Sequence, residues 1–164
     1  MSKDAAAVAV RVAAAYRRVQ ETGMRDVPIC NPALDVAAVG FRRREGAWIG
    51  VLVTPWSMNL LRLPVHSEAG ARRTAATTRT LRLPSGEYEF LACYNADIGH
   101  HETCSLFSPV LQFADQAAAV ATANAVLALV LDERMAGLAG AQTTAPRPVT
   151  RRALLRAILG VSPA

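Results

Sequence analysis

Residues 48–63, with the sequence WIGVLVTPWSMNLLRL, decide the fold. Two runs of bulky apolar residues, Trp48–Thr54 and Trp56–Leu63, stand on either side of Pro55, and Pro64 follows the second run. Runs rich in β-branched and aromatic residues and bounded by proline are typical of strands. The stretch therefore predicts two consecutive strands joined by a short connection.

The sequence beyond this stretch predicts three more strands. Their expected ranges are Thr80–Leu83, Tyr88–Tyr94 and about Glu102–Phe107. The first two are separated by Pro84-Ser85-Gly86-Glu87, where proline presets one backbone dihedral and glycine accepts a positive one. Residues 95–101 form the next expected turn.

A helix is expected on each side of the strands. Residues 4–22 carry apolar residues at helical spacing, and residues 114–138 form a long apolar segment with Asp115 placed to cap it. Residues 24–46 are expected to be irregular because they contain two prolines and a charged run. The order helix, strands, helix predicts an α+β two-layer sandwich with an antiparallel sheet of about five strands.

The length of 164 residues fits one core-bearing domain. We expect a domain over residues 1–140 with a loop near 65–78, a linker over 141–149 that contains Pro146 and Pro148, and a basic amphipathic tail over 150–164. No uninterrupted apolar run has the length of a membrane span, and charges interrupt the N-terminal segment. Three cysteines without a CxxC pair favour reduced thiols, so a cytoplasmic protein is expected.

The positive charge is unevenly distributed. Residues 83–140 carry a net charge of −6 and residues 141–164 a net charge of +4, so that residues 1–140 together are only +1. A nearly neutral body is not the footprint of a nucleic-acid-binding surface. An acidic central stretch and a basic tail are expected instead.

No catalytic residue, cofactor or metal is predicted. The histidines and cysteines lack metal-ligand spacing, and neither a GxSxG elbow nor a phosphate-binding loop is present. Cys93 and Cys104 are expected on neighbouring strands, as two small apolar residues that could lie close together. Because His100 and His101 are near Cys104 in the sequence, a redox or enzymatic role that depends on Cys104 stays open as an alternative.

The connection around Pro55 offers a surface that would suit a peptide. Trp56 and Met58 would form an adaptable apolar surface, whereas Trp48 is expected to pack in the core; core packing of Trp56 stays open. A basic segment of a partner would find carboxylates in the acidic stretch. These are Glu87, Glu89, Asp97 and Glu102.

The tail contains Arg151-Arg152-Ala153-Leu154-Leu155, which looks like the twin-arginine export consensus. It stands at the wrong end of the chain to be this protein's own export signal. One interpretation is a short amphipathic helix that docks through its leucines. Another is mimicry of a partner's signal sequence by Arg151, Arg152, Leu154 and Leu155. A third, contact with anionic lipid by a membrane-surface adaptor, is not favoured because the segment is short.

Several motifs in a fixed order resemble the HybE/HupJ family of NiFe-hydrogenase assembly chaperones. They are Asn31-Pro32, Val39-Gly40-Phe41, residues 48–56, residues 83–90, residues 104–109 and the tail. The resemblance implies an accessory protein, not an enzyme, that holds an immature hydrogenase subunit. The small-subunit precursor with its twin-arginine signal is the expected partner, and other maturation proteins are further candidates. Some relatives carry an attached rubredoxin, but this chain lacks its paired CxxC motifs.

Overall fold

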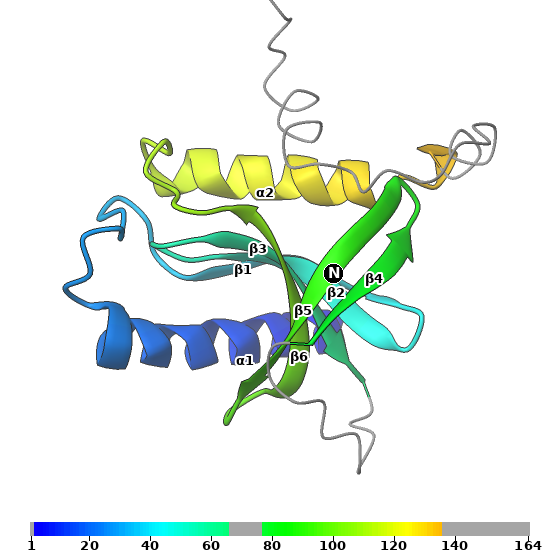
Figure 1. Cartoon of the computed structure of the whole chain (residues 1–164), viewed down its shortest axis with the longest axis horizontal. Helices are drawn as coiled ribbons and strands as arrows, with labels where there is room; N and C mark the ends of the chain where they lie inside the picture. Colours follow the sequence, from blue (N-terminus) through cyan, green and yellow to red (C-terminus); the bar gives the residue numbers. More distant parts are fainter. Residues whose placement is uncertain (1, 66–76, 136–164) are drawn as a thin grey trace, which may run out of the picture.

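The computed structural model describes residues 2–65 and 77–135 (Figure 1). The helical elements are α1 (Lys3–Val19), the π-helical turn η1 (Gln20–Met24), α2 (Gln116–Val130) and the 3-10 turn η2 (Glu133–Met135). The strands are β1 (Ala37–Arg44), β2 (Ala47–Val53), β3 (Met58–Pro64), β4 (Thr78–Leu83), β5 (Gly86–Asn95) and β6 (Gly99–Phe107).

All six strands form one sheet in the order β1-β2-β3-β6-β5-β4, and every neighbouring pair is antiparallel. The predicted α+β class is confirmed, with six strands in place of about five. The additional strand, β1, lies within residues 24–46, which were expected to be irregular. The charged run closes a hairpin: Glu45 and Gly46 both have positive φ, 47° and 72°, as a two-residue turn between twisted strands requires.

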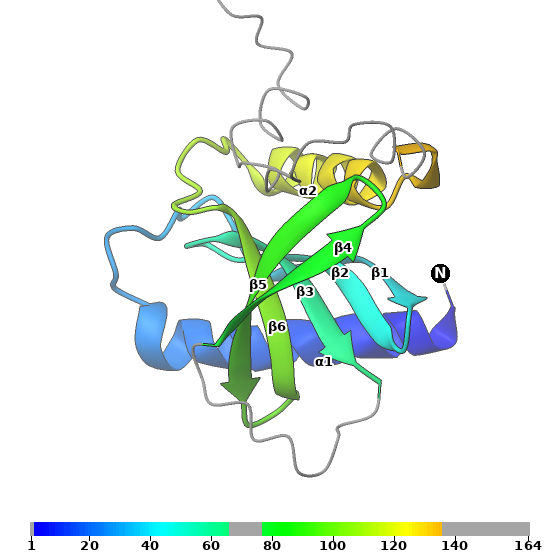
Figure 2. The ribbon, with the colours of Figure 1, turned by 45° about the vertical axis from the view of Figure 1, so that its right-hand side comes forward.

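The two helices cover opposite faces of the sheet, so the sheet is a middle layer and not one half of a two-layer sandwich (Figures 1 and 2). Val51 and Val53 of β2 pack in the cluster that contains α2, whereas Leu52 packs in the cluster that contains α1. A strand covered on both faces has a nearly continuous apolar sequence instead of an alternating one. This explains the composition of residues 48–53.

Both helices begin at a side-chain cap. Ser2 Oγ accepts a hydrogen bond from the Ala5 amide at 3.2 Å, and the predicted cap Asp115 accepts one from the Ala118 amide at 2.7 Å. The helix that follows Asp115 ends at Val130, well before the expected residue 138. Three charged residues, Asp132, Glu133 and Arg134, interrupt the apolar sequence soon after this end.

The sheet opens between β5 and β6. Only residues Leu91–Asn95 of β5 pair with β6, while the first half of β5 pairs with β4 alone. The β4–β5 turn instead reaches the C-terminal end of α2, where the Ser85 amide donates to the Val130 carbonyl at 3.3 Å (Figure 2). The first half of β5 therefore lies towards the C-terminal end of α2.

The expected linker over 141–149 and the basic tail over 150–164 lie outside the described residues, as does most of the expected loop near 65–78. Within residues 2–65 and 77–135, no helix combines the length and the apolar character needed to cross a bilayer.

Candidate partner-binding site

Three loops that are far apart in the sequence meet at one end of the molecule, and Asn31 joins them. Its backbone amide donates to the Pro55 carbonyl at 2.7 Å. Its side-chain amide donates to the carbonyls of Val110 and Phe113, at 3.0 and 2.8 Å. We call the surface formed by residues 25–36, 54–57 and 108–115 the three-loop end; it lies at the left of Figure 1, near the start of α2.

The β2–β3 connection forms the middle loop. Thr54 Oγ1 donates to the Ser57 carbonyl at 2.9 Å and accepts from the Ser57 amide at 3.0 Å, which fixes the turn around Pro55 and Trp56. Trp56 is half-buried, as is Trp48, which packs against the α1-side cluster.

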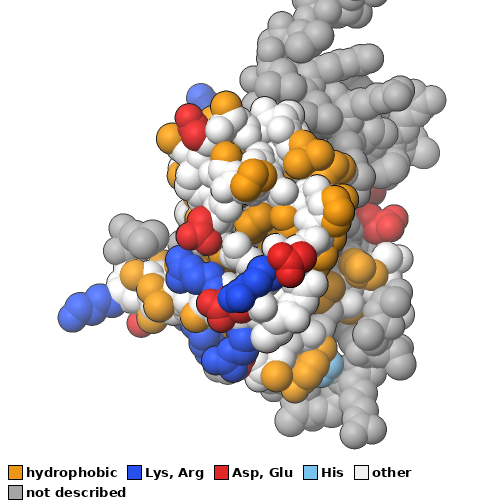
Figure 3. Space-filling view, turned by 90° about the vertical axis from the view of Figure 1, so that its left-hand side faces the viewer, with side chains coloured by type: hydrophobic (Ala, Val, Ile, Leu, Met, Phe, Trp, Pro, Cys, Tyr) orange, Lys and Arg blue, Asp and Glu red, His pale blue; other side chains and the backbone are white. Residues whose placement is uncertain are grey.

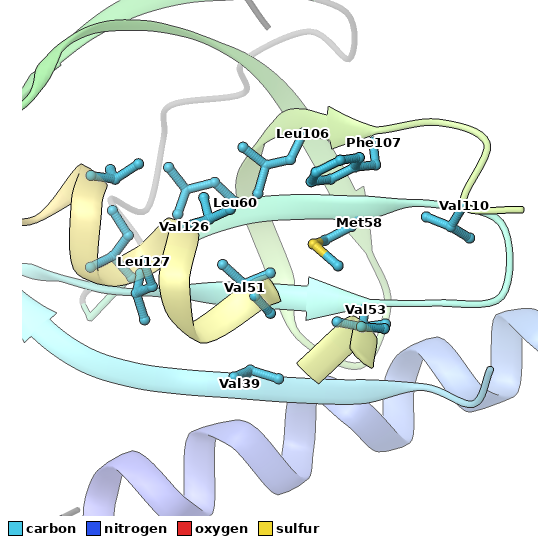
Figure 4. Close-up of a cluster of buried hydrophobic side chains, with 14 of the residues drawn as sticks. Val39, Val51, Val53, Met58, Leu60, Leu106, Phe107, Val110, Val126 and Leu127 are labelled. Atoms are coloured by element: carbon cyan, nitrogen blue, oxygen red, sulfur yellow. The ribbon is translucent and has the colours of Figure 1, made fainter. Parts of the chain in front are cut away.

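Met58 was predicted to lie on the surface with Trp56, and this is wrong. It is fully buried among Val53, Leu60 and Phe107 under α2 (Figure 4). Met58 is the first residue of β3, and side chains two apart on a strand share a face. It therefore points inward with Leu60.

A pocket of about 510 Å³ opens at the three-loop end, between η1 and the loop that follows it. Its apolar wall includes Met24, Val27, Leu34 and Pro55. Its charged groups are Arg17, Glu21, Arg25 and Asp35. A wall of this mixed kind suits a polypeptide segment that carries both apolar and charged side chains.

One of the two carboxylates of the pocket, Asp35, accepts a hydrogen bond on Oδ1 from the Val36 amide at 2.8 Å. Neither Glu21 nor Asp35 forms an ion pair with any residue that the structure describes. Of the two arginines, Arg17 donates to the Val36 carbonyl at 3.3 Å. The pocket is thus able to accept a cationic side chain of a partner without first breaking an ion pair within the described residues.

Two of the loops at the three-loop end carry exposed apolar side chains. Ile29 is 45% exposed in the loop before Asn31, and Leu111 is 56% exposed in the loop after β6. Figure 3 looks onto this end and shows hydrophobic side chains beside acidic and basic ones. Side chains of this type add to binding when a partner covers them.

The four predicted carboxylates do not form a common site with Trp56. Glu102 lies between Arg62 and Arg79, each 2.8 Å from its Oε2, and is 5% exposed. Burial alone would raise the pKa of Glu102, but the hydrogen bonds from the two arginines outweigh it and lower the pKa. Asp97 pairs with Arg18 at 3.0 Å. The prediction that Glu102 receives a partner's basic group is therefore wrong.

Glu87 and Glu89 stand elsewhere on the molecule. They belong to the half of β5 that has left β6, opposite Arg82 and Thr80 of β4. That half approaches the C-terminal end of α2, whereas the three-loop end lies at its start. These two carboxylates and Trp56 are therefore on different parts of the surface.

The two cysteines considered for redox or metal chemistry are also separated. Cys93 pairs with His101 across β5 and β6, whereas Cys104 pairs with Leu60 of β3, so that the two cysteines point to opposite faces of the sheet. The two cysteines are on neighbouring strands, as expected, but the open possibility that they lie close together is not met because they face opposite sides. Among the described residues, no group of three or more His, Cys, Asp or Glu is arranged to hold a metal ion.

Comparison with known proteins identifies the family. A family model described as "[NiFe]-hydrogenase assembly, chaperone, HybE" matches residues 7–157. The chain is 44% identical to the hydrogenase expression/formation protein HupJ of Bradyrhizobium diazoefficiens, over 95% of this chain and 91% of the relative. It is 40% identical to the hydrogenase expression/formation protein HupT of Azotobacter chroococcum, over 89% and 93%.

The solution structure of HybE from Escherichia coli has the same fold, with a TM-score of 0.60 at 24% identity over 74% of this chain and 75% of that one. The family model and the relatives confirm the family that the motifs of the sequence resemble. The chain belongs to the HybE family of NiFe-hydrogenase assembly chaperones.

Proposed function

We propose that the three-loop end holds an immature hydrogenase subunit, and that it grips the twin-arginine signal segment of a small-subunit precursor without changing a covalent bond. The observation that carries this proposal is the convergence at Asn31. Three of the segments that resemble the family, Asn31-Pro32, residues 48–56 and residues 104–109, reach the same end of the fold, beside a pocket.

The chemistry of the pocket matches the chemistry of such a segment. A twin-arginine signal has a basic head followed by an apolar body. Glu21 and Asp35 would receive the guanidinium groups, because arginine and carboxylate form strong charge-assisted hydrogen bonds. The apolar wall of the pocket, with Ile29 and Leu111 outside it, would cover the body.

Apolar burial and the carboxylates would contribute to binding in different ways. Burial of apolar surface contributes about 25 cal/mol per Å² before the costs of association, and it would supply most of the affinity. The carboxylates would mainly set the register and the rate of encounter. The protein would act in the cytoplasm, where a precursor still carries its export signal.

Binding of a fluorescein-labelled signal peptide from a hydrogenase small subunit, measured by anisotropy, tests the proposal. The full-length double variant Glu21→Gln, Asp35→Asn removes both charges and keeps the hydrogen-bond acceptors. We expect it to bind the peptide about tenfold more weakly, which corresponds to about 1.4 kcal/mol. The weakening should shrink at high salt.

A charge-matched control is available on β5. The double variant Glu87→Gln, Glu89→Gln makes the same change of charge away from the three-loop end and should bind like the unmodified protein. Loss of binding in the β5 variant alone would show that the peptide binds near Glu87 and Glu89 and not at the three-loop end. Equal binding by all three proteins would reject the three-loop end as the site.

A further inference from the structure

We infer that the chain's own segment around Arg151-Arg152-Ala153-Leu154-Leu155 binds at the three-loop end and competes with the partner's signal segment. The inference rests on the proposed function, because it concerns regulation of the same site. It assigns the basic tail a role as an internal competitor of the partner.

The first argument is the match of chemical groups. Residues 141–164 contain four arginines and no acidic residue, and Leu154 and Leu155 follow the paired arginines directly. The pocket offers Glu21 and Asp35 next to an apolar wall. A segment that presents two guanidinium groups and then two leucines therefore presents the same groups as the partner's signal.

The second argument is that two of the other candidate carboxylates, Glu102 and Asp97, are already engaged by arginines. Glu102 lies between Arg62 and Arg79, and Asp97 pairs with Arg18. A basic segment would have to displace an arginine at either place. At Glu21 and Asp35 no described residue has to be displaced from an ion pair.

The third argument is reach. The described chain ends at Met135, just after α2, and the three-loop end lies at the start of this 15-residue helix. At 1.5 Å per residue, the helix is about 22 Å long. Residues 136–150, which lead to the paired arginines, span up to about 50 Å when extended. The tail is therefore long enough to return to the pocket.

The size of the effect follows from effective concentration. A short tether holds a segment at about 1 mM near its site. If the segment alone binds with a Kd of about 0.3 mM, the tail occupies the site most of the time and weakens partner binding about fourfold. Removal of the competing groups should therefore tighten peptide binding by roughly fourfold.

The test uses two full-length variants with the same loss of charge. Arg151→Ala, Arg152→Ala removes the paired arginines, and Arg147→Ala, Arg156→Ala is the matched control. Two-dimensional NMR follows the indole N–H of Trp56 and the side-chain amide of Asn31 without any partner present. We expect both signals to shift in the first variant, to stay in the control, and to be independent of protein concentration.

The outcomes separate this inference from the proposed function. Unchanged signals in the first variant overturn the inference. The proposed function is tested independently, by the peptide-binding experiment with the Glu21 and Asp35 double variant. Shifts that depend on concentration overturn it as well, because the tail would then come from a second copy. Concentration-independent shifts with unchanged peptide affinity overturn competition and also place the peptide outside the three-loop end.

Discussion

The hydroxyl of Tyr16 on α1 lies 2.9 Å from Nε2 of His101 on β6, 85 residues further along the chain. Nδ1 of the same ring lies 3.0 Å from the Gly99 carbonyl oxygen, which can only accept, so Nδ1 carries the proton. Nε2 then accepts a hydrogen bond from Tyr16. Burial raises the pKa of Tyr16 to about 12, so the phenol remains a donor throughout the neutral range.

Tyr16→Phe should lower the free energy of unfolding by about 1–2 kcal/mol, because it leaves Nε2 of a histidine that is only 2% exposed without this donor. Urea unfolding followed by circular dichroism measures the loss. Tyr94→Phe is the control: Tyr94 is 62% exposed and packs against His100, and its variant should unfold like the unmodified protein. Equal losses would show that the bond adds no stability.

Stability should fall as the pH drops from about 7 to 5. Burial lowers the pKa of His101 below its ordinary value of 6.5, so the unfolded chain takes up a proton first as the pH falls through 6.5. The stabilisation by neutral His101 is complete above this pH and is lost below it. His101→Gln should flatten this part of the pH profile of unfolding. His100→Gln removes only the smaller contribution of the neighbouring imidazole and should keep most of the profile. A profile unchanged by His101→Gln would assign the pH dependence to other groups.

Gly40→Ala should destabilise the protein by about 3 kcal/mol. The residue has a φ of 65°, and a Cβ there would lie 2.5 Å from Cδ2 of the buried Leu127. Strained backbone contributes about 1–2 kcal/mol and forced repacking a similar amount.

Gly46→Ala is a matched control, with a φ of 72° and no atom within 4 Å of the added carbon. It should cost only about 1 kcal/mol. Thermal unfolding of both variants measures the difference. Equal shifts of the melting temperature would show that α2 moves aside for the added carbon at residue 40 without a cost in stability.

Asn31→Ala should lower the free energy of unfolding by about 2–3 kcal/mol, because the buried side chain donates two hydrogen bonds to the loop after β6. It should also weaken binding of the signal peptide, since the loops would lose their alignment. Asn124→Ala, on the exposed surface of α2, serves as the control and should change neither property. Chemical unfolding and anisotropy measure both effects. If the Asn31→Ala protein is less stable but binds the peptide with full affinity, the peptide does not bind at the aligned loops.

The sequence predicted the central strands because β2 and β3 consist almost entirely of apolar residues. It did not predict β1, since a register shift between Val39 and Arg42 and the positive φ of Gly40 interrupt the alternation of side chains. The three arginines at its end also have the composition of a solvated loop. Strand pairing with β2 overrides that local preference.

The candidate site was harder to predict because it depends on contacts across the whole chain. Asn31 and its two acceptors are separated by 79 and 82 residues, a relation that periodicity does not contain. The arginines that neutralise Glu102 come from strands 40 and 23 residues away. The burial of Met58, by contrast, was accessible from the sequence, because it lies two residues before Leu60 on the same strand.

The convergence of three loops at Asn31 exists only in the folded chain, so the proposed binding of a client there would also affect stability. An unfolded chain has no such end, so a client that binds there binds the folded state alone, and mass action adds its binding free energy to folding. A client at a hundred times its Kd would contribute about 2.7 kcal/mol. In a cell that makes the chaperone without its hydrogenase, proteases would meet the less stable form, and chaperone abundance would follow the supply of client.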